Sequence, residues 1–154
     1  MTGANDRISR DDVERARSAI AAAGVLVCQL EIPLEITMAA LAIAREEATT
    51  TILNPAPAVA GLAPELYELV DILCPSEVET ELLVGHELEP GGEAAAELLT
   101  RGARSVILTL GERGCLVHTA AESVLLPAER VEARDTTGAG DAFVGSLAYF
   151  LARG

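Results

Sequence analysis

The sequence predicts an α/β domain in which a mostly parallel sheet is flanked by helices in a three-layer arrangement. Short apolar runs of strand-like composition alternate along the chain with longer segments of helical periodicity. Such alternation produces crossover connections, which build parallel sheets covered on both faces. The 154 residues suit a single domain, 1–154. Half of the residues are hydrophobic but only 3% are aromatic, so Ala, Val, Leu and Ile must form the core.

Caps and breakers delimit the elements of the first half of the chain. Ser9 suits an N-cap because Asp12 follows three residues later, and Gly24 suits the end of that helix. Prolines in the stretch Asn54-Pro55-Ala56-Pro57 prevent a central strand from continuing there. We therefore expect, in order, a helix over 10–22, a buried strand over 25–30, a helix over 34–48, a strand over 50–53 and a loop over 54–57.

The second half continues this pattern and then changes. Pro75 ends a short apolar run, and two helical segments precede a strongly apolar strand. Three short runs then resemble an antiparallel meander, and an apolar helix follows a glycine-rich turn. The expected elements are a strand over 70–74, helices over 77–84 and 92–101, a strand over 105–110, a meander over 115–119, 124–127 and 130–133, and a last helix over the apolar run 142–151.

Charge and residue content exclude several classes of function. The formal net charge of −13 argues against nucleic-acid binding, which needs surfaces rich in Lys and Arg. The sequence contains no lysine, and all 11 of its basic Lys or Arg residues are arginine. This excludes a Walker A lysine, a protein-kinase strand lysine and a Schiff-base lysine. A nucleotide-handling protein of this sequence must hold phosphates through backbone amides, a metal ion or arginine.

Cysteines, histidines and apolar runs favour an intracellular protein. Cys28, Cys74 and Cys115 are widely spaced and each lies in an apolar segment, so we expect buried, reduced thiols. His86 and His118 are far apart in the sequence, which argues against zinc. No apolar run is long enough to span a bilayer, and the first residues lack a signal-peptide pattern. We expect a soluble protein of the cytoplasm, or of the nucleus, that does not bind membranes.

Polar residues follow several predicted strands at the point where each strand ends. Glu31, Asn54, Glu77 with Glu79, and Thr109-Leu110-Gly111 hold these positions. Because ligands of parallel sheets bind at the carboxyl ends of strands, a shared site at this edge is expected. Plainer alternatives exist for each residue: Glu31 could cap the next helix, the glutamates could form a solvated helix face, and a Thr-Leu-Gly turn is common.

The stretch Asp135-Thr136-Thr137-Gly138-Ala139-Gly140-Asp141 opens the last helix. Unpaired N–H groups at the positive end of a helix bind anions, and Asp141 would place a base beside a bound anion. An anion site with an adjacent base indicates phosphoryl transfer to an alcohol. The alternative is a glycine turn in which Asp135 forms an Asx turn and Asp141 merely favours the helix dipole.

Four motifs carry a resemblance when they are taken together. They are Gln29-Leu30-Glu31, Asn54-Pro55-Ala56-Pro57, Thr109-Leu110-Gly111 with Gly114, and the stretch from Asp135 to Asp141. In order and approximate spacing they resemble the PfkB family of carbohydrate kinases, and the first two motifs are similar to those of its ribokinases. The resemblance runs from Gly3 to Phe150 and implies a ribokinase-like fold that is truncated at both ends. It also implies ATP-dependent phosphorylation of D-ribose at its primary hydroxyl, which gives ribose 5-phosphate.

The resemblance implies a role for each matching residue. Asp141 would bind the sugar and take the proton of its hydroxyl, Glu31 would hydrogen-bond the sugar, and the amides of Gly138, Ala139 and Gly140 would form an anion hole. The nucleotide site would consist of Ser76, Thr109, Leu110, Gly111, Glu112, Arg113, Gly114, Gly140 and Asp141. Asp135 and Thr137 would bind a monovalent cation, K⁺, and Glu79 would organise Mg²⁺ through water.

Departures from the family pattern leave alternatives open. Ser76 stands where the family usually has asparagine, which predicts weaker binding of nucleotide or Mg²⁺. The resemblance covers only the central and C-terminal part of a ribokinase, so one alternative is a catalytically inactive remnant that binds nucleotide or a partner subunit. Another is a different sugar or nucleoside kinase of the family. The resemblance also implies that related kinases often form homodimers through a flap, which we expect to be absent from this sequence.

Overall fold

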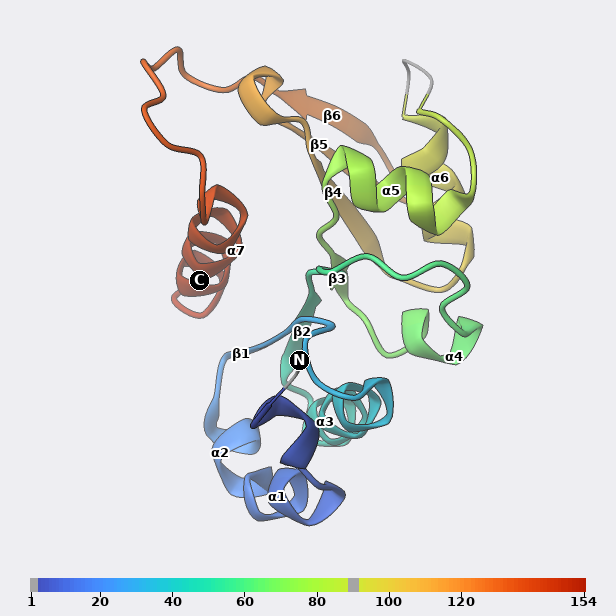
Figure 1. The fold of residues 1–154 in the computed structure, drawn as a ribbon, viewed down its shortest axis with the longest axis vertical. Coiled ribbons are helices and arrows are strands. Elements are labelled where there is room, and N and C mark those ends of the chain that lie inside the picture. The colour runs from blue at the N-terminus through green and yellow to red at the C-terminus, as the bar shows by residue number, and fades with distance from the viewer. Residues whose placement is uncertain (1–2, 89–91) are drawn as a thin grey trace.

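A six-stranded sheet forms the centre of the computed structural model, which describes residues 3–88 and 92–154. The strand order is β1-β2-β3-β4-β5-β6 (Figure 1). The strands are β1 Val25–Cys28, β2 Thr50–Leu53, β3 Ile72–Leu73, β4 Ser105–Thr109, β5 Cys115–Thr119 and β6 Ser123–Leu126. Strands β1 to β4 are parallel, whereas β5 and β6 extend the sheet antiparallel. The carboxyl ends of the four parallel strands therefore meet at one edge.

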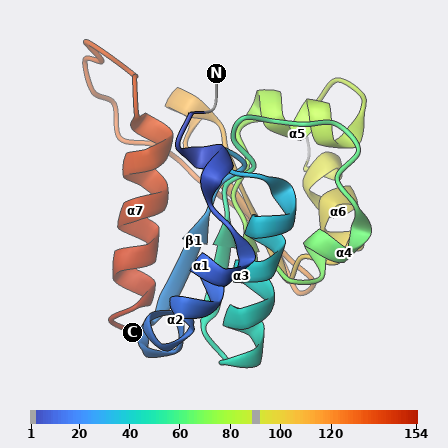
Figure 2. The ribbon, with the colours of Figure 1, turned by 60° about the horizontal axis from the view of Figure 1, so that its bottom comes forward.

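Helices cover both faces of this sheet. They are α1 Arg10–Arg15, α2 Arg17–Ala22, α3 Leu34–Glu46, α4 Pro64–Tyr67, α5 Glu77–Val84, α6 Glu93–Thr100 and α7 Ala139–Leu151. Leu41 of α3, Leu66 of α4 and Leu98 of α6 share one buried cluster with strand residues, whereas Val144 of α7 packs with Ile107 in another. Figure 2 shows α7 and α3 on opposite sides of β1. The predicted three-layer α/β fold with an antiparallel end is confirmed.

The N-cap at Ser9 is as predicted, although the helix that follows is not continuous. The hydroxyl of Ser9 accepts the N–H of Asp12 at 3.3 Å, and the Asp12 carboxylate accepts the N–H of Ser9 at 2.9 Å. This reciprocal pair satisfies N–H groups that a helix start otherwise leaves free. The helix expected over 10–22 divides at Ala16, where α1 ends and α2 begins.

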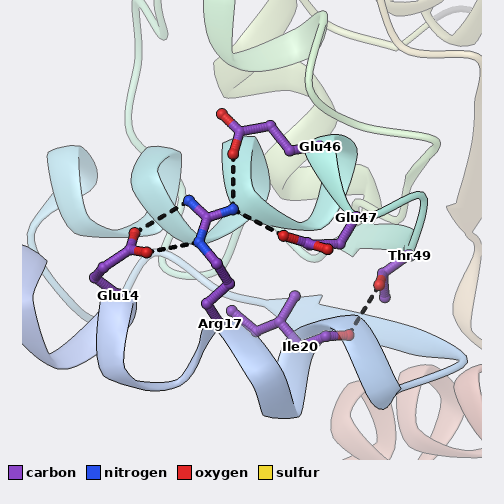
Figure 3. Close-up of polar contacts among 6 residues, drawn as sticks. All are labelled: Glu14, Arg17, Ile20, Glu46, Glu47 and Thr49. Carbon is purple, nitrogen blue, oxygen red and sulfur yellow. Dashed lines mark hydrogen bonds and ion pairs between the residues drawn. The ribbon is translucent and has the colours of Figure 1, made fainter.

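Arg17, the first residue of α2, ties the N-terminal helices to the end of α3. Its guanidinium donates to Glu14 at 2.6 Å, to Glu46 at 2.8 Å and to Glu47 at 2.9 Å (Figure 3). Hydrogen bonds to these carboxylates, led by that to Glu14, raise the pKa of Arg17. Figure 3 also shows the Thr49 hydroxyl donating to the carbonyl of Ile20, at 2.8 Å.

The strand expected over 130–133 is absent, and this prediction was wrong. Residues 127–138 form an irregular connection between β6 and α7, drawn in orange in Figure 1. Val131 and Ala133 would share the apolar face of such a strand, but Val131 is 80% exposed and Ala133 is exposed too, so this face is not buried against the sheet. Pairing in the described sheet ends instead with β6.

Smaller differences concern element ends and one short helix. The strand expected over 25–30 ends at Cys28, and the strand expected over 70–74 is reduced to β3. Helix α4, which begins with Pro64 and buries Leu66 and Tyr67, was not predicted from the sequence. The loop expected over 54–57 is present.

Helix α7 closely approaches the start of β1. A Cβ placed on Gly24 would lie 3.0 Å from the Cβ of Ala152, just beyond the end of α7, so the two backbones are nearly in contact there. Strand β1 is also an edge of the described sheet, because β2 is its only partner among the described residues. None of the helices in the described ranges combines the length and apolarity needed to cross a membrane.

Candidate active site

Loops at the carboxyl ends of β2, β3 and β4 face the start of α7 across a small cleft. The cleft has a volume of ≈ 200 Å³, and its lining includes Asn54, Ser76, Glu79, Thr109, Gly138, Gly140 and Asp141. These residues come from four separate segments of the sequence, which the parallel sheet brings together. Three of the predicted strand-end residues, Asn54, Glu79 and Thr109, thus meet the glycine-rich turn at one place, whereas Glu77 lines another cavity.

The turn before α7 has the conformation that a helix-start anion site requires, with one amide already engaged. Gly138 is the N-cap in the left-handed region, at φ 74°, where a side chain would be strained. The N–H of Ala139 donates to the carbonyl of Thr136 at 3.1 Å. No acceptor among the described residues binds the N–H of Gly138 or Gly140. Of the three amides predicted for the anion hole, Ala139 is therefore occupied in this structure.

Asp135 stabilises the same turn locally. Its Oδ1 accepts the N–H of Thr137 at 2.8 Å, which is the Asx turn weighed as the plain alternative. Hydrogen bonds from the backbone and then the side chain of Thr137 lower the pKa of Asp135. Both residues are exposed and offer oxygen atoms, which suit a hard cation. The described ranges contain no group of three or more His, Cys, Asp or Glu residues that could hold a metal ion.

Asp141 lies in the first turn of α7, with its carboxylate bound to Gln29, the residue that follows β1. The Nε2 of Gln29 donates to Asp141 Oδ1 at 3.0 Å and to Asn54 Oδ1 at 3.2 Å. The Nδ2 of Asn54 in turn donates to the carbonyl of Cys74 at 2.9 Å. Neither Gln29 nor Asn54 has an individual role predicted from the sequence, although both follow strands at the predicted edge.

Ser76 and Glu79 form the cap of α5 at the wall of the cleft. The Glu79 Oε2 accepts the N–H of Ser76 at 2.7 Å, and the Ser76 hydroxyl accepts the N–H of Glu79 at 3.4 Å. Glu77 pairs with Arg113, and Glu81 accepts the N–H of Leu88 at 3.2 Å. The glutamates of α5 are therefore structural partners as well as candidate ligands.

A second, more apolar cavity opens beside the cleft and shares Thr109, Ala139 and Gly140 with it. Its volume is ≈ 400 Å³, and its other lining residues are Gly111, Gly114, Cys115, Leu126, Pro127, Ala128 and Phe143. Gly114, at φ 100°, is essential to this shape, because a Cβ there would lie 1.9 Å from the carbonyl oxygen of Leu126. Glycine therefore lets the end of β6 close over the turn after β4.

Several predicted site residues lie outside these two cavities. Leu110 and Arg113 line a separate cavity of ≈ 550 Å³, and Glu112 is exposed. Glu31 is exposed and does not line the cleft, and its backbone carbonyl accepts the Nδ2 of Asn5 at 3.2 Å. Pro33, without a side-chain cap, precedes α3, so Glu31 is not the N-cap residue of that helix.

The three cysteines are free thiols close to these elements. Burial raises the pKa of Cys28 to about 11 and that of Cys74, mainly by the same cause, to about 12. Burial also raises the pKa of Cys115. Thiols with such pKa values stay protonated near neutral pH and are poor nucleophiles.

The family is decided by comparison with known proteins. Residues 2–154 match the pfkB family carbohydrate kinases. The chain belongs to the pfkB family. It is 45% identical to a ribokinase of Mus musculus in an alignment of 157 residues that covers 99% of this chain and 49% of that protein. The chain therefore spans about half the length of this relative.

Solved structures of ribokinases share the fold. The crystal structure of a Thermotoga maritima ribokinase matches with a TM-score of 0.88 at 31% identity, over 100% of this chain and 51% of that one. A structure of Arabidopsis thaliana ribokinase complexed with ribose and ATP matches with a TM-score of 0.84 at 27% identity, over 96% of this chain and 47% of that one. The ribokinase resemblance of the four motifs thus extends to the arrangement of the whole chain.

Proposed function

We propose that this chain transfers the γ-phosphoryl group of ATP to the primary hydroxyl of D-ribose, which gives ribose 5-phosphate and ADP. The observation that carries the proposal is the meeting of Asp141 with the open amides of Gly138 and Gly140 in one cleft. A base and an anion site side by side are what transfer to an alcohol requires. The likeness to ribokinases supports ribose as the acceptor.

In the proposed reaction the sugar oxygen forms a bond to the γ-phosphorus, and the bond from that phosphorus to the β–γ bridging oxygen breaks. The electron pair of the broken bond stays on ADP, and the hydroxyl proton passes to the Asp141 carboxylate. Since phosphoryl transfer has a loose transition state, the protein mainly positions groups and stabilises charge. The amides of Gly138 and Gly140 would bind the equatorial oxygens without having to reorganise.

The two adjoining cavities suggest how ATP would lie. The apolar cavity, with Phe143 and Leu126 in its wall, suits the base of the nucleotide. Thr109 and Gly140 line both cavities and would contact the phosphates between them. Ser76 would contact the phosphates from α5, with a hydroxyl that already serves as a helix cap.

Cations and the sugar would bind around this axis. Asp135 and Thr137 would supply oxygen ligands to K⁺, which would order the turn before Gly138. Glu79 has one oxygen bound to the Ser76 N–H, and its other oxygen would hold a water of hydrated Mg²⁺. When bound, Mg²⁺ neutralises charge on the transferring phosphates. Glu31 would hydrogen-bond the sugar from the loop after β1.

The test is ADP formation by the purified chain with Mg²⁺-ATP, K⁺ and ribose. We expect ribose-dependent turnover that falls by about 10²–10⁴ in Asp141→Asn, the usual cost of losing a general base. ATP binding measured by calorimetry should persist in that variant. Near-normal turnover by Asp141→Asn would refute the role of the carboxylate. Competition between ribose and other sugars or nucleosides then ranks the substrates.

The exposure of the site to solvent favours a second candidate function, nucleotide binding without turnover. All residues from Asp135 to Asp141 are exposed, and phosphoryl transfer needs water to be excluded. If the chain binds ATP but forms no ADP in the presence of ribose, this second function replaces the first. Cross-linking and sedimentation of the purified chain would then test for the partner subunit that completes the site.

A further inference from the structure

Two carboxamides between the sheet and α7 have their orientations set by the backbone. A carbonyl oxygen can only accept, so the Asn54 group that lies 2.9 Å from the Cys74 carbonyl must be its NH₂. The Oδ1 of Asn54 then points toward Gln29, and only the NH₂ of Gln29 can donate to it, at 3.2 Å. Asn54 is 8% exposed, so this anchor is buried.

The same Gln29 nitrogen reaches α7. It donates to Asp141 Oδ1 at 3.0 Å, across 112 residues of sequence. Within the described chain, no other hydrogen bond joins a side chain of α7 to the sheet or to its loops. Because Asn54 fixes which end of the Gln29 amide faces Asp141, the group offered to the carboxylate is always a donor.

We propose that Gln29, oriented by Asn54, is a positioning residue for Asp141 in the proposed phosphoryl transfer. The inference rests on that proposed function. Gln29 holds Oδ1 and thereby fixes the rotation of the carboxylate, which leaves Oδ2 to receive the hydroxyl proton. An N–H donor complements the ionised carboxylate that must accept this proton. Without Gln29, an exposed aspartate samples several rotamers, of which few are productive.

The contact itself can be tested without any turnover. Gln29 is the only glutamine in the sequence, so selective ¹⁵N labelling of glutamine gives a single pair of side-chain NH₂ signals in an NMR spectrum. We expect Asp141→Ala to move the amide protons of Gln29 upfield, because they lose a charged acceptor. Glu35→Ala is the matched control, since Glu35 is also an exposed acid in the first turn of a helix. An unchanged Gln29 signal in Asp141→Ala would overturn the proposal.

The positioning role is tested by kinetics. Gln29→Leu should lower kcat for ribose-dependent ADP formation by up to about 100-fold, the cost of a misplaced reacting group. KM for ribose and for ATP should change by less than about twofold, since Gln29 acts through Asp141. In an Asp141→Asn background, Gln29→Leu should cause no further loss.

Each kinetic outcome decides a different point. An unchanged kcat in Gln29→Leu, or an equal further loss in the Asp141→Asn background, would overturn the positioning role. If the wild-type chain shows no ribose-dependent turnover, the proposed function fails by itself, and the amide signal still decides whether Gln29 holds Asp141.

Discussion

Replacing Gly114 by alanine tests the close approach that shapes the apolar cavity. The new Cβ would lie 1.9 Å from the carbonyl oxygen of Leu126 and 2.7 Å from the N of Ala128, and both are backbone atoms. Relieving such overpacking costs about 1–3 kcal/mol. Holding alanine at φ 100° adds about 1–3 kcal/mol. Together the free energy of unfolding should fall by about 2–6 kcal/mol.

Gly111→Ala is the matched control for this prediction. Gly111 also has a positive φ, 57°, but a Cβ there would meet no atom within 4 Å. The free energy of unfolding of Gly111→Ala should therefore fall only by the cost of the left-handed backbone, about 1–2 kcal/mol. Thermal unfolding should therefore show a Tm decrease of roughly 4–24 °C for Gly114→Ala and a smaller decrease for Gly111→Ala. Equal Tm values for the two variants would refute the steric argument.

Further changes test the cap, the core and a titrating pair. Ser76→Asn should strengthen binding of Mg²⁺-ATP in calorimetry. An unchanged affinity would contradict the expectation that Ser76 binds nucleotide or Mg²⁺ more weakly than asparagine does. Leu98→Ala should lower the free energy of unfolding by about 2–5 kcal/mol in urea titrations, because Leu98 is fully buried. Hydrogen bonds to the Glu87 carbonyl and then to Glu97 raise the pKa of His86. The stability that these hydrogen bonds of protonated His86 contribute is therefore complete below pH 6.5, the ordinary pKa of histidine. It is lost as the pH rises through the higher pKa of His86 in the folded protein. Glu97→Gln should lower the His86 pKa in an NMR titration, and no change would exclude this contact.

Sequence patterns were sufficient for most of the fold because they reflect local physics. The Ser9 cap, the apolar runs of β2 and β4 and the prolines after β2 each act within a few residues. The break at Ala16 and the absent strand over 130–133 depend on contacts outside the segment. In the first case α2 packs on α3, and in the second the apolar face of Val131 and Ala133 stays exposed instead of packing on the sheet.

The candidate site also has some features that the local sequence predicts and others that depend on the assembled fold. The glycine turn before α7 was predictable, since a positive φ at Gly138 and a helix start follow from the residues themselves. The engagement of the Ala139 amide depends on where the Thr136 carbonyl points, which residue types do not reveal. The contact of Gln29 with Asp141 joins residues 112 positions apart and appears only once the sheet and α7 are assembled.

The near contact between Gly24 and Ala152 makes the tilt of α7 depend on the space at Gly24. The contact restrains the C-terminal end of α7, a helix of 13 residues that is about 20 Å long. Gly138 and Asp141 lie at the opposite end of this helix. Tilting such a rod by about 5° about its gripped end moves the far end by about 2 Å, enough to take an amide out of hydrogen-bonding range of a phosphate. Bulk added at Gly24 should therefore affect the proposed phosphoryl transfer from the distant end of the helix, without touching any residue of the candidate site.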